Sequence, residues 1–173
     1  MATVEAIANI STVLTQQHEG YILRQSGSVT LSDMREHPVI LIGAYDNDWT
    51  LRLLADLRFK FSQSPRFQIY DSMNPSDIWA RPMATPIYGN TDDYAIVARM
   101  RDKLTENTVV LVSGISKNGT ASASQFVTSS RYIDMLDRPA TKDWAQKNLE
   151  IVLKTHVIDG KIGPPTIEKV YLW

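Results

Sequence analysis

Residues 39–42, with the sequence Val-Ile-Leu-Ile, constrain the fold of this chain more than any other segment. Pro38 precedes the run and Gly43 follows it, so the run is bounded at both ends. Three of its four residues are β-branched and none is polar, a pattern typical of a central strand that is covered on both faces. The run therefore predicts an α/β protein built around a buried sheet.

The other elements are predicted from the spacing of apolar residues and from the turn residues between them. Helical spacing predicts helices at residues 4–14, 31–35, 49–57, 121–128, 131–136 and 144–148. Apolar or alternating runs predict strands at residues 21–24, 67–70, 94–99, 108–114, 148–157 and 166–172. Short connections in the first half favour parallel pairing, and the close pair 94–99 and 108–114 favours a hairpin. We expect a three-layer mixed sheet with a parallel Rossmann- or flavodoxin-like core and antiparallel hairpins in the C-terminal half.

Length and composition fit one α/β domain spanning residues 1–173, with 43% hydrophobic residues available for a core. The 18 basic and 19 acidic residues nearly balance, which argues against direct binding to nucleic acid. No run approaches the roughly 18 apolar residues of a membrane span, so a cytoplasmic location is expected. The absence of cysteine excludes disulfides, thiolate metal sites and cysteine nucleophiles. The Pro-rich residues 71–93 are expected to form a long ordered loop, a candidate lid.

Two loops follow predicted parallel strands, and ligands of open α/β sheets bind at that end of the strands. In the first loop, Tyr45, Asn47 and Trp49 are candidates to line a pocket, with Arg52 one turn into the next helix. The alternative is that Asn47, or the aspartate after it, only caps that helix. The Asp-Asn-Asp sequence at residues 46–48 lacks the later glycine and glutamate of a calcium loop, so no metal is expected.

The second loop, residues 114–120, joins an apolar strand to a predicted helix. A helix start presents free backbone N–H groups to an anion, and Lys117 adds a positive charge. The candidate ligand-binding residues here are Gly114, Lys117, Asn118, Gly119 and Thr120. The spacing matches neither a Walker motif nor a dinucleotide fingerprint, and a purely structural use of the two glycines stays open.

Catalytic patterns are scarce, and no catalytic residue, metal or cofactor is predicted. His18, His37 and His156 form no zinc-binding pair, and no serine stands in a nucleophile-elbow sequence. An enzymatic alternative remains, acting on nucleotides or phosphoesters. It would use Asp46, Asp48 or Asp92 as acids and Lys117 as a phosphate clamp.

Three segments, residues 38–53, 93–99 and 147–173, together resemble an uncharacterised α/β module. That module stands at the carboxyl end of bacterial regulatory proteins that carry a winged-helix or transmembrane region. The resemblance covers most of residues 4–173 and implies a regulatory context without implying a chemistry. The related modules begin with a further apolar strand, so this chain is expected to be an excised piece or to obtain that edge from a partner. An open edge favours pairing with another chain, and we expect a homodimer.

Taken together, these features favour a non-enzymatic sensor or effector domain. It would bind a small polar or anionic ligand where the parallel strands end, with residues 71–93 closing over it. The first alternative is an interaction or oligomerisation module without a small ligand, assembled through apolar edges. The second is the nucleotide- or phosphoester-acting enzyme.

Overall fold

The computed structural model describes residues 2–82 and 90–173 and contains a six-stranded mixed sheet. Its strand order is β1-β6-β5-β7-β8, and β9 also pairs with β7. The strands are β1 (Val39–Ile42), β5 (Asn90–Arg101), β6 (Thr108–Gly114), β7 (Leu149–Ile158), β8 (Lys161–Ile162) and β9 (Thr166–Leu172). The long apolar runs thus join one mixed sheet, and the predicted antiparallel β5–β6 hairpin is confirmed.

Among the described residues, only β1 and β6 pair in parallel, and the other pairs of this sheet are antiparallel. The predicted Rossmann- or flavodoxin-like core is therefore wrong. That prediction assumed that the strand after residues 39–42 returns beside it through a helical crossover. Instead β2 (Phe59–Ser62) and β3 (Gln68–Asp71) form an antiparallel hairpin, because five connecting residues suit a hairpin while a parallel crossover needs a dozen or more.

The β2–β3 hairpin continues into β4 (Ile78–Ala80), which completes a separate three-stranded antiparallel sheet. Sequence analysis missed both β2 and β4. Of the candidate lid, residues 71–93, the structure describes β4 and the beginning of β5. Residues 83–89 of that prediction lie outside the described part of the chain.

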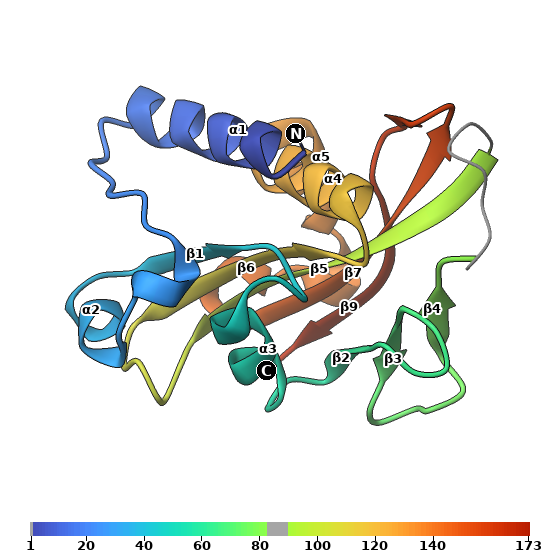
Figure 1. Cartoon of the computed structure of the whole chain (residues 1–173), viewed down its shortest axis with the longest axis horizontal. Coiled ribbons are helices and arrows are strands. Elements are labelled where there is room, and N and C mark those ends of the chain that lie inside the picture. Colours follow the sequence, from blue (N-terminus) through green and yellow to red (C-terminus); the bar gives the residue numbers. More distant parts are fainter. Residues whose placement is uncertain (1, 83–89) are drawn as a thin grey trace.

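Both faces of the main sheet are covered, one by helices and the other by helices together with the small sheet (Figure 1). One face carries α1 (Ala2–Gln16), α4 (Lys117–Val127) and α5 (Ser130–Ile133), and the other carries α2 (Leu31–Glu36), α3 (Asp48–Leu54) and the small sheet. Short 3-10 turns are η1 (Ser26–Ser28), η2 (Asp134–Leu136), η3 (Pro139–Thr141) and η4 (Trp144–Gln146). No helix within residues 2–82 and 90–173 is long and apolar enough to cross a bilayer.

Each face of the main sheet has its own apolar core. Phe126 of α4 and Ile151 of β7 are fully buried on the α1–α4 side, and Phe59 and Leu111 are fully buried on the other. Alternate residues of β5 face these two cores: Ala95 and Val97 belong to the first, and Ile96 to the second. Burial on both faces explains the apolar runs within these strands, at residues 95–98 of β5, 109–112 of β6 and 151–153 of β7.

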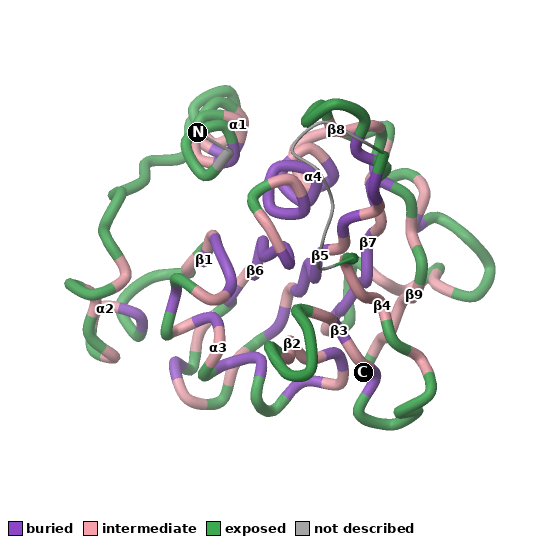
Figure 2. Tube along the Cα trace, turned by 45° about the vertical axis from the view of Figure 1, so that its right-hand side comes forward, coloured by how far each residue is buried: buried purple, intermediate pink, exposed green. Residues whose placement is uncertain are grey.

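The sequence predicts a central strand at residues 39–42. In the structure this strand, β1, forms one edge of the main sheet. Residues 21–24, also predicted to be a strand, instead form an irregular link between α1 and η1. Figure 2 shows this link as an exposed stretch beyond the β1 side of the sheet. Two apolar segments that the sequence analysis places inside the sheet therefore lie at its periphery.

Candidate functional site

The turn between β6 and α4 surrounds a fully buried carboxylate, that of Asp93 on β5. One carboxylate oxygen accepts hydrogen bonds from the Gly119 backbone N–H at 3.0 Å and from the Ser116 hydroxyl. The other accepts from the Tyr94 backbone N–H at 2.9 Å. The start of α4, where the sequence predicts an anion, therefore binds an anion that the chain itself supplies.

The two glycines of this turn allow the helix to approach the sheet closely. A Cβ at Gly119 would lie 2.4 Å from the carbonyl oxygen of Tyr94 on β5. A Cβ at Gly114 would lie 2.1 Å from the backbone nitrogen of Thr120. The Thr120 hydroxyl accepts a hydrogen bond from the Gly114 N–H at 3.1 Å. Gly114, Gly119 and Thr120 thus have a structural role, which is to hold the start of α4 close to the sheet.

The remaining candidates of this turn are more accessible. Lys117 is exposed, and Asn118 is half-buried, with its backbone N–H donated to the Ser116 hydroxyl oxygen at 3.2 Å. Their role in holding a ligand stays a prediction.

The candidates of the first loop all make contacts within the chain. Asn47 caps α3 by accepting from the Thr50 N–H at 3.3 Å, which confirms the capping alternative. The Trp49 indole donates to the Val29 carbonyl at 3.0 Å, and the Arg52 guanidinium lies 5.3 Å from the Trp49 ring centroid. Tyr45 donates its hydroxyl to a carbonyl of β2 at 3.0 Å, and burial raises its pKa to about 12. Their ligand-binding role also stays a prediction.

A cavity of about 370 Å³ opens where the two loops approach the small sheet. The described residues that line it are Phe67, Arg81, Pro82 and Ile115. Ile115 follows β6 directly, and the ring of Phe67 packs edge-on against Tyr45 at 5.1 Å between centroids. The cavity therefore lies beside the carboxyl ends of β1 and β6, the one parallel pair that the described residues form.

Arg81 gives this apolar cavity a positive charge. Its Nε atom is buried and has no hydrogen-bond partner among residues 2–82 and 90–173. A buried N–H without a partner is costly, by about 1–3 kcal/mol and more for a charged group. An acceptor entering the cavity would recover that free energy.

Arg81 and Asp93 also act on each other electrostatically. Burial raises the pKa of the Asp93 carboxyl, while its hydrogen bonds and the positive charge of Arg81 oppose that rise. The charge of Arg81 at the cavity thus acts on Asp93 at the start of α4. Sequence analysis did not find this site, because the cavity residues Phe67, Arg81 and Ile115 are far apart in the chain.

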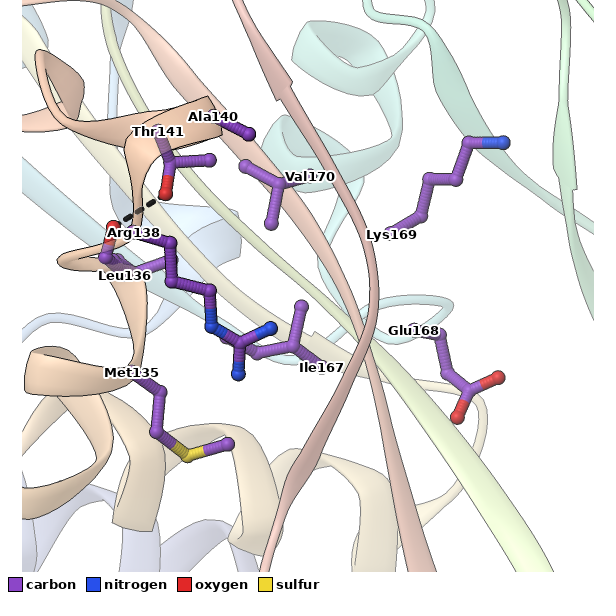
Figure 3. Close-up of a pocket in the computed structure, with 9 residues that line it drawn as sticks. All are labelled: Met135, Leu136, Arg138, Ala140, Thr141, Ile167, Glu168, Lys169 and Val170. Carbon is purple, nitrogen blue, oxygen red and sulfur yellow. Dashed lines mark hydrogen bonds between the residues drawn. The ribbon is translucent and has the colours of Figure 1, made fainter.

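A second cavity, of about 300 Å³, lies between β9 and the segment from η2 to η3 (Figure 3). Ile167 and Val170 of β9 face it, together with the exposed Arg138. A register shift at Glu168 turns Glu168 and Lys169 away from the cavity, as Figure 3 shows. No buried polar group without a partner points into this second cavity from the described residues, so it offers a ligand less than the first.

A buried cluster of charges joins the two sheets. Glu150 of β7 is fully buried and accepts the backbone N–H groups of Arg58 at 3.1 Å and Phe59 at 3.0 Å. The Arg58 side chain forms two hydrogen bonds to Asp71 of β3, at 2.9 and 2.7 Å. Burial raises the pKa of Glu150 to about 8 despite its two N–H donors. Because these bonds hold β2 against β7, the cluster has a structural role.

A further cluster of polar side chains lies on the surface of β5 and β7. Asp92 accepts from Lys154 at 2.8 Å and lies 2.9 Å from Nδ1 of His156. These hydrogen bonds lower the pKa of Asp92 against the opposing effect of partial burial. Asp46 and Asp48, the other candidate acids, are exposed in the first loop. No three histidine, aspartate or glutamate side chains of the described residues gather as a metal site would require.

Comparisons with models of known families, with curated proteins and with solved structures found no match to this chain. The resemblance to the bacterial regulatory module therefore stays a prediction.

Proposed function

We propose that this chain is a sensor or effector domain that binds a small anionic ligand in the cavity lined by Phe67, Arg81, Pro82 and Ile115. The observation that carries the proposal is the buried Nε–H of Arg81, which has no hydrogen-bond partner in the described part of the chain although Arg81 lines that cavity. A carboxylate or phosphate oxygen is the natural acceptor for a guanidinium N–H.

The chemistry of the cavity narrows the ligand class. Apart from Arg81, its described lining is apolar, and its volume of about 370 Å³ is at the small end for ligand pockets. We therefore expect a ligand with one anionic head and a compact apolar body, such as a small aromatic or aliphatic carboxylate. The same position suits the role that the resemblance implies, a module that reports on a small molecule within a bacterial regulatory protein.

Binding rather than catalysis is favoured by how the reactive groups near the cavity are used. The Asp93 carboxylate and the Ser116 hydroxyl are engaged in fixing the start of α4, and the Tyr45 hydroxyl is donated to β2. A bound anion would partly neutralise the positive charge that Arg81 presents to Asp93. This would change the electrostatic potential at the start of α4. That helix offers a route for passing the binding event to the rest of the molecule.

Thermal unfolding with benzoate, hexanoate and inorganic phosphate tests the proposal. At a hundred times its Kd a ligand adds about 2.7 kcal/mol. For a chain of this length that corresponds to a rise in Tm of roughly 5–10 °C. We expect benzoate or hexanoate to raise Tm more than phosphate does.

Two variants locate the effect. Arg81→Gln should abolish the rise in Tm, whereas Arg66→Gln, which removes an exposed arginine from the β2–β3 connection, should leave it intact. A rise that persists in Arg81→Gln, or no rise with any of the three anions, would reject this site.

A further inference from the structure

The edge of the main sheet formed by β1 is apolar and carries no charge. Its residues are Val-Ile-Leu-Ile, without a charge or an internal proline, and β6 is its one strand partner among the described residues. Ile40 remains 37% exposed there. Proteins usually blunt such an edge with charges, proline or a covering segment, because its free backbone groups pair readily with another strand. This edge lacks the charge and the proline.

The link between α1 and η1 contains a second unpartnered apolar segment, residues 20–24, which we call the strap. Tyr21, Ile22 and Leu23 are 50%, 76% and 62% exposed, although three consecutive apolar residues rarely remain in water. None of the five strap residues makes a backbone–backbone hydrogen bond. The strap therefore has both the apolar side chains and the free backbone groups of an unpaired strand.

We propose that the chain forms a homodimer in which the strap of each copy pairs with the β1 edge of the other. Both partners are present in one chain, so a two-fold arrangement satisfies two straps and two edges at once. The lengths agree, because residues 21–24 match the four residues of β1. This is strand addition between identical chains.

The alternation of side chains fits the added strand. Val39 and Leu41 of β1 face the core beneath the sheet, whereas Ile42 packs against the α1–α4 core. In a paired strap, Tyr21 and Leu23 share one face and Ile22 the opposite face. One register places Tyr21 and Leu23 beside Val39 and Leu41, where they extend the core on the α2–α3 side, and places Ile22 beside the exposed Ile40.

The structure itself favours a second copy over closure within one chain. The strap is already tethered on the β1 side of its own molecule, as Figures 1 and 2 show, yet forms no backbone bond with β1. Its path from α1 on one face to α2 on the other carries it across the edge instead of along it. A strap arriving from another copy has no such restriction on its direction.

Sedimentation velocity on the full chain, over about two orders of magnitude in concentration, tests this proposal. We expect a monomer–dimer equilibrium for the natural sequence. Ile22→Asp should raise the dimer Kd at least about tenfold. Ile22 is so exposed that this variant should still fold, which circular dichroism would check. Met73→Asp changes a comparably exposed apolar residue, 68% exposed in the β3–β4 turn, and should leave the dimer intact.

Cross-linking identifies the contact, since the chain has no natural cysteine. A ¹⁵N-labelled Ile22→Cys chain is mixed with an unlabelled Ile40→Cys chain, oxidised and digested. Peptides that join residues 22 and 40 with mixed isotopes are expected, because these two side chains share a face of the extended sheet, and the control pair Met73→Cys with Ile40→Cys should give none. A monomer at every concentration, a dimer unaffected by Ile22→Asp, or no 22–40 cross-link would overturn the proposal.

Discussion

Replacing Glu150 by glutamine should remove much of the pH dependence of this protein's stability. Glu150 is fully buried in β7, and burial raises its pKa from 4.5 to about 8. The folded state therefore holds a proton that the unfolded chain releases between these two pH values. Because the folded state binds more protons there, the free energy of unfolding falls as pH rises.

The size of the effect follows from the pKa difference. One pKa unit corresponds to about 1.36 kcal/mol, so a rise from 4.5 to about 8 amounts to roughly 5 kcal/mol. Below about pH 4.5 the carboxyl is protonated in both states and this loss vanishes. Above about pH 8 it is ionised in both states and the loss is complete. The slope between them approaches 1.4 kcal/mol per pH unit.

Urea unfolding at several pH values between 5 and 8.5 measures this slope. Glu150→Gln should flatten it, whatever the variant's absolute stability, and Glu168→Gln, an exposed residue of β9, should leave it unchanged. The carboxyl ¹³C shift of Glu150 gives the pKa directly and does not depend on the variant folding. A slope that Glu150→Gln leaves unchanged, or a titration of Glu150 near pH 4.5, would refute the reasoning.

Two further predictions concern stability measured by the same urea unfolding. Gly119→Ala should destabilise the fold by about 3 kcal/mol, because its Cβ would lie 2.4 Å from a carbonyl oxygen of β5. Gly27→Ala, with nothing within 4 Å, should change stability little, and equal losses would contradict this explanation. Asp71→Asn should cost about 3–5 kcal/mol by leaving Arg58 without its buried partner. Asp77→Asn, which breaks a surface pair, should cost at most about 1 kcal/mol, and a reversed order would be evidence against the buried cluster.

Much of the main sheet could be predicted from the sequence because its strands are long and apolar. The runs that became β5, β6, β7 and β9 are bounded by turn residues and contain apolar or alternating stretches, so each carries its own signal. The error at residues 39–42 has a physical cause. An apolar run shows that both faces of a strand avoid water, but it contains nothing about whether a second neighbour pairs along its edge.

The small sheet and the site were harder to predict. β2 is only four residues long, although the alternation Phe59-Lys60-Phe61-Ser62 was a readable signal. The sequence analysis predicted an anion site at the start of α4 and named Asp92 as a candidate acid, but it could not connect that helix start with the neighbouring Asp93. The Asp93–Gly119 contact is set by tertiary packing of residues 26 positions apart. Arg81 gives no local signal, because its significance depends on burial without a partner.

If a ligand anion partly neutralises the charge of Arg81, its binding should raise the pKa of Asp93. Asp93 should then take up a proton when the ligand binds. Affinity for benzoate should then weaken as pH rises through the pKa of Asp93, and calorimetry in two buffers should show the proton uptake. Asp93→Asn should bind without that uptake. Uptake of the same size in Asp93→Asn would assign the proton to another group.

The Nε–H of Arg81 is the group on which the functional proposal depends, and its resonance can be followed directly. In a ¹H–¹⁵N spectrum of the full chain titrated with benzoate, we expect this one arginine Nε–H signal to move downfield and saturate. Among the exposed arginines, Arg66 should stay unchanged. A saturating response elsewhere in the protein, with the Arg81 signal unmoved, would contradict the account.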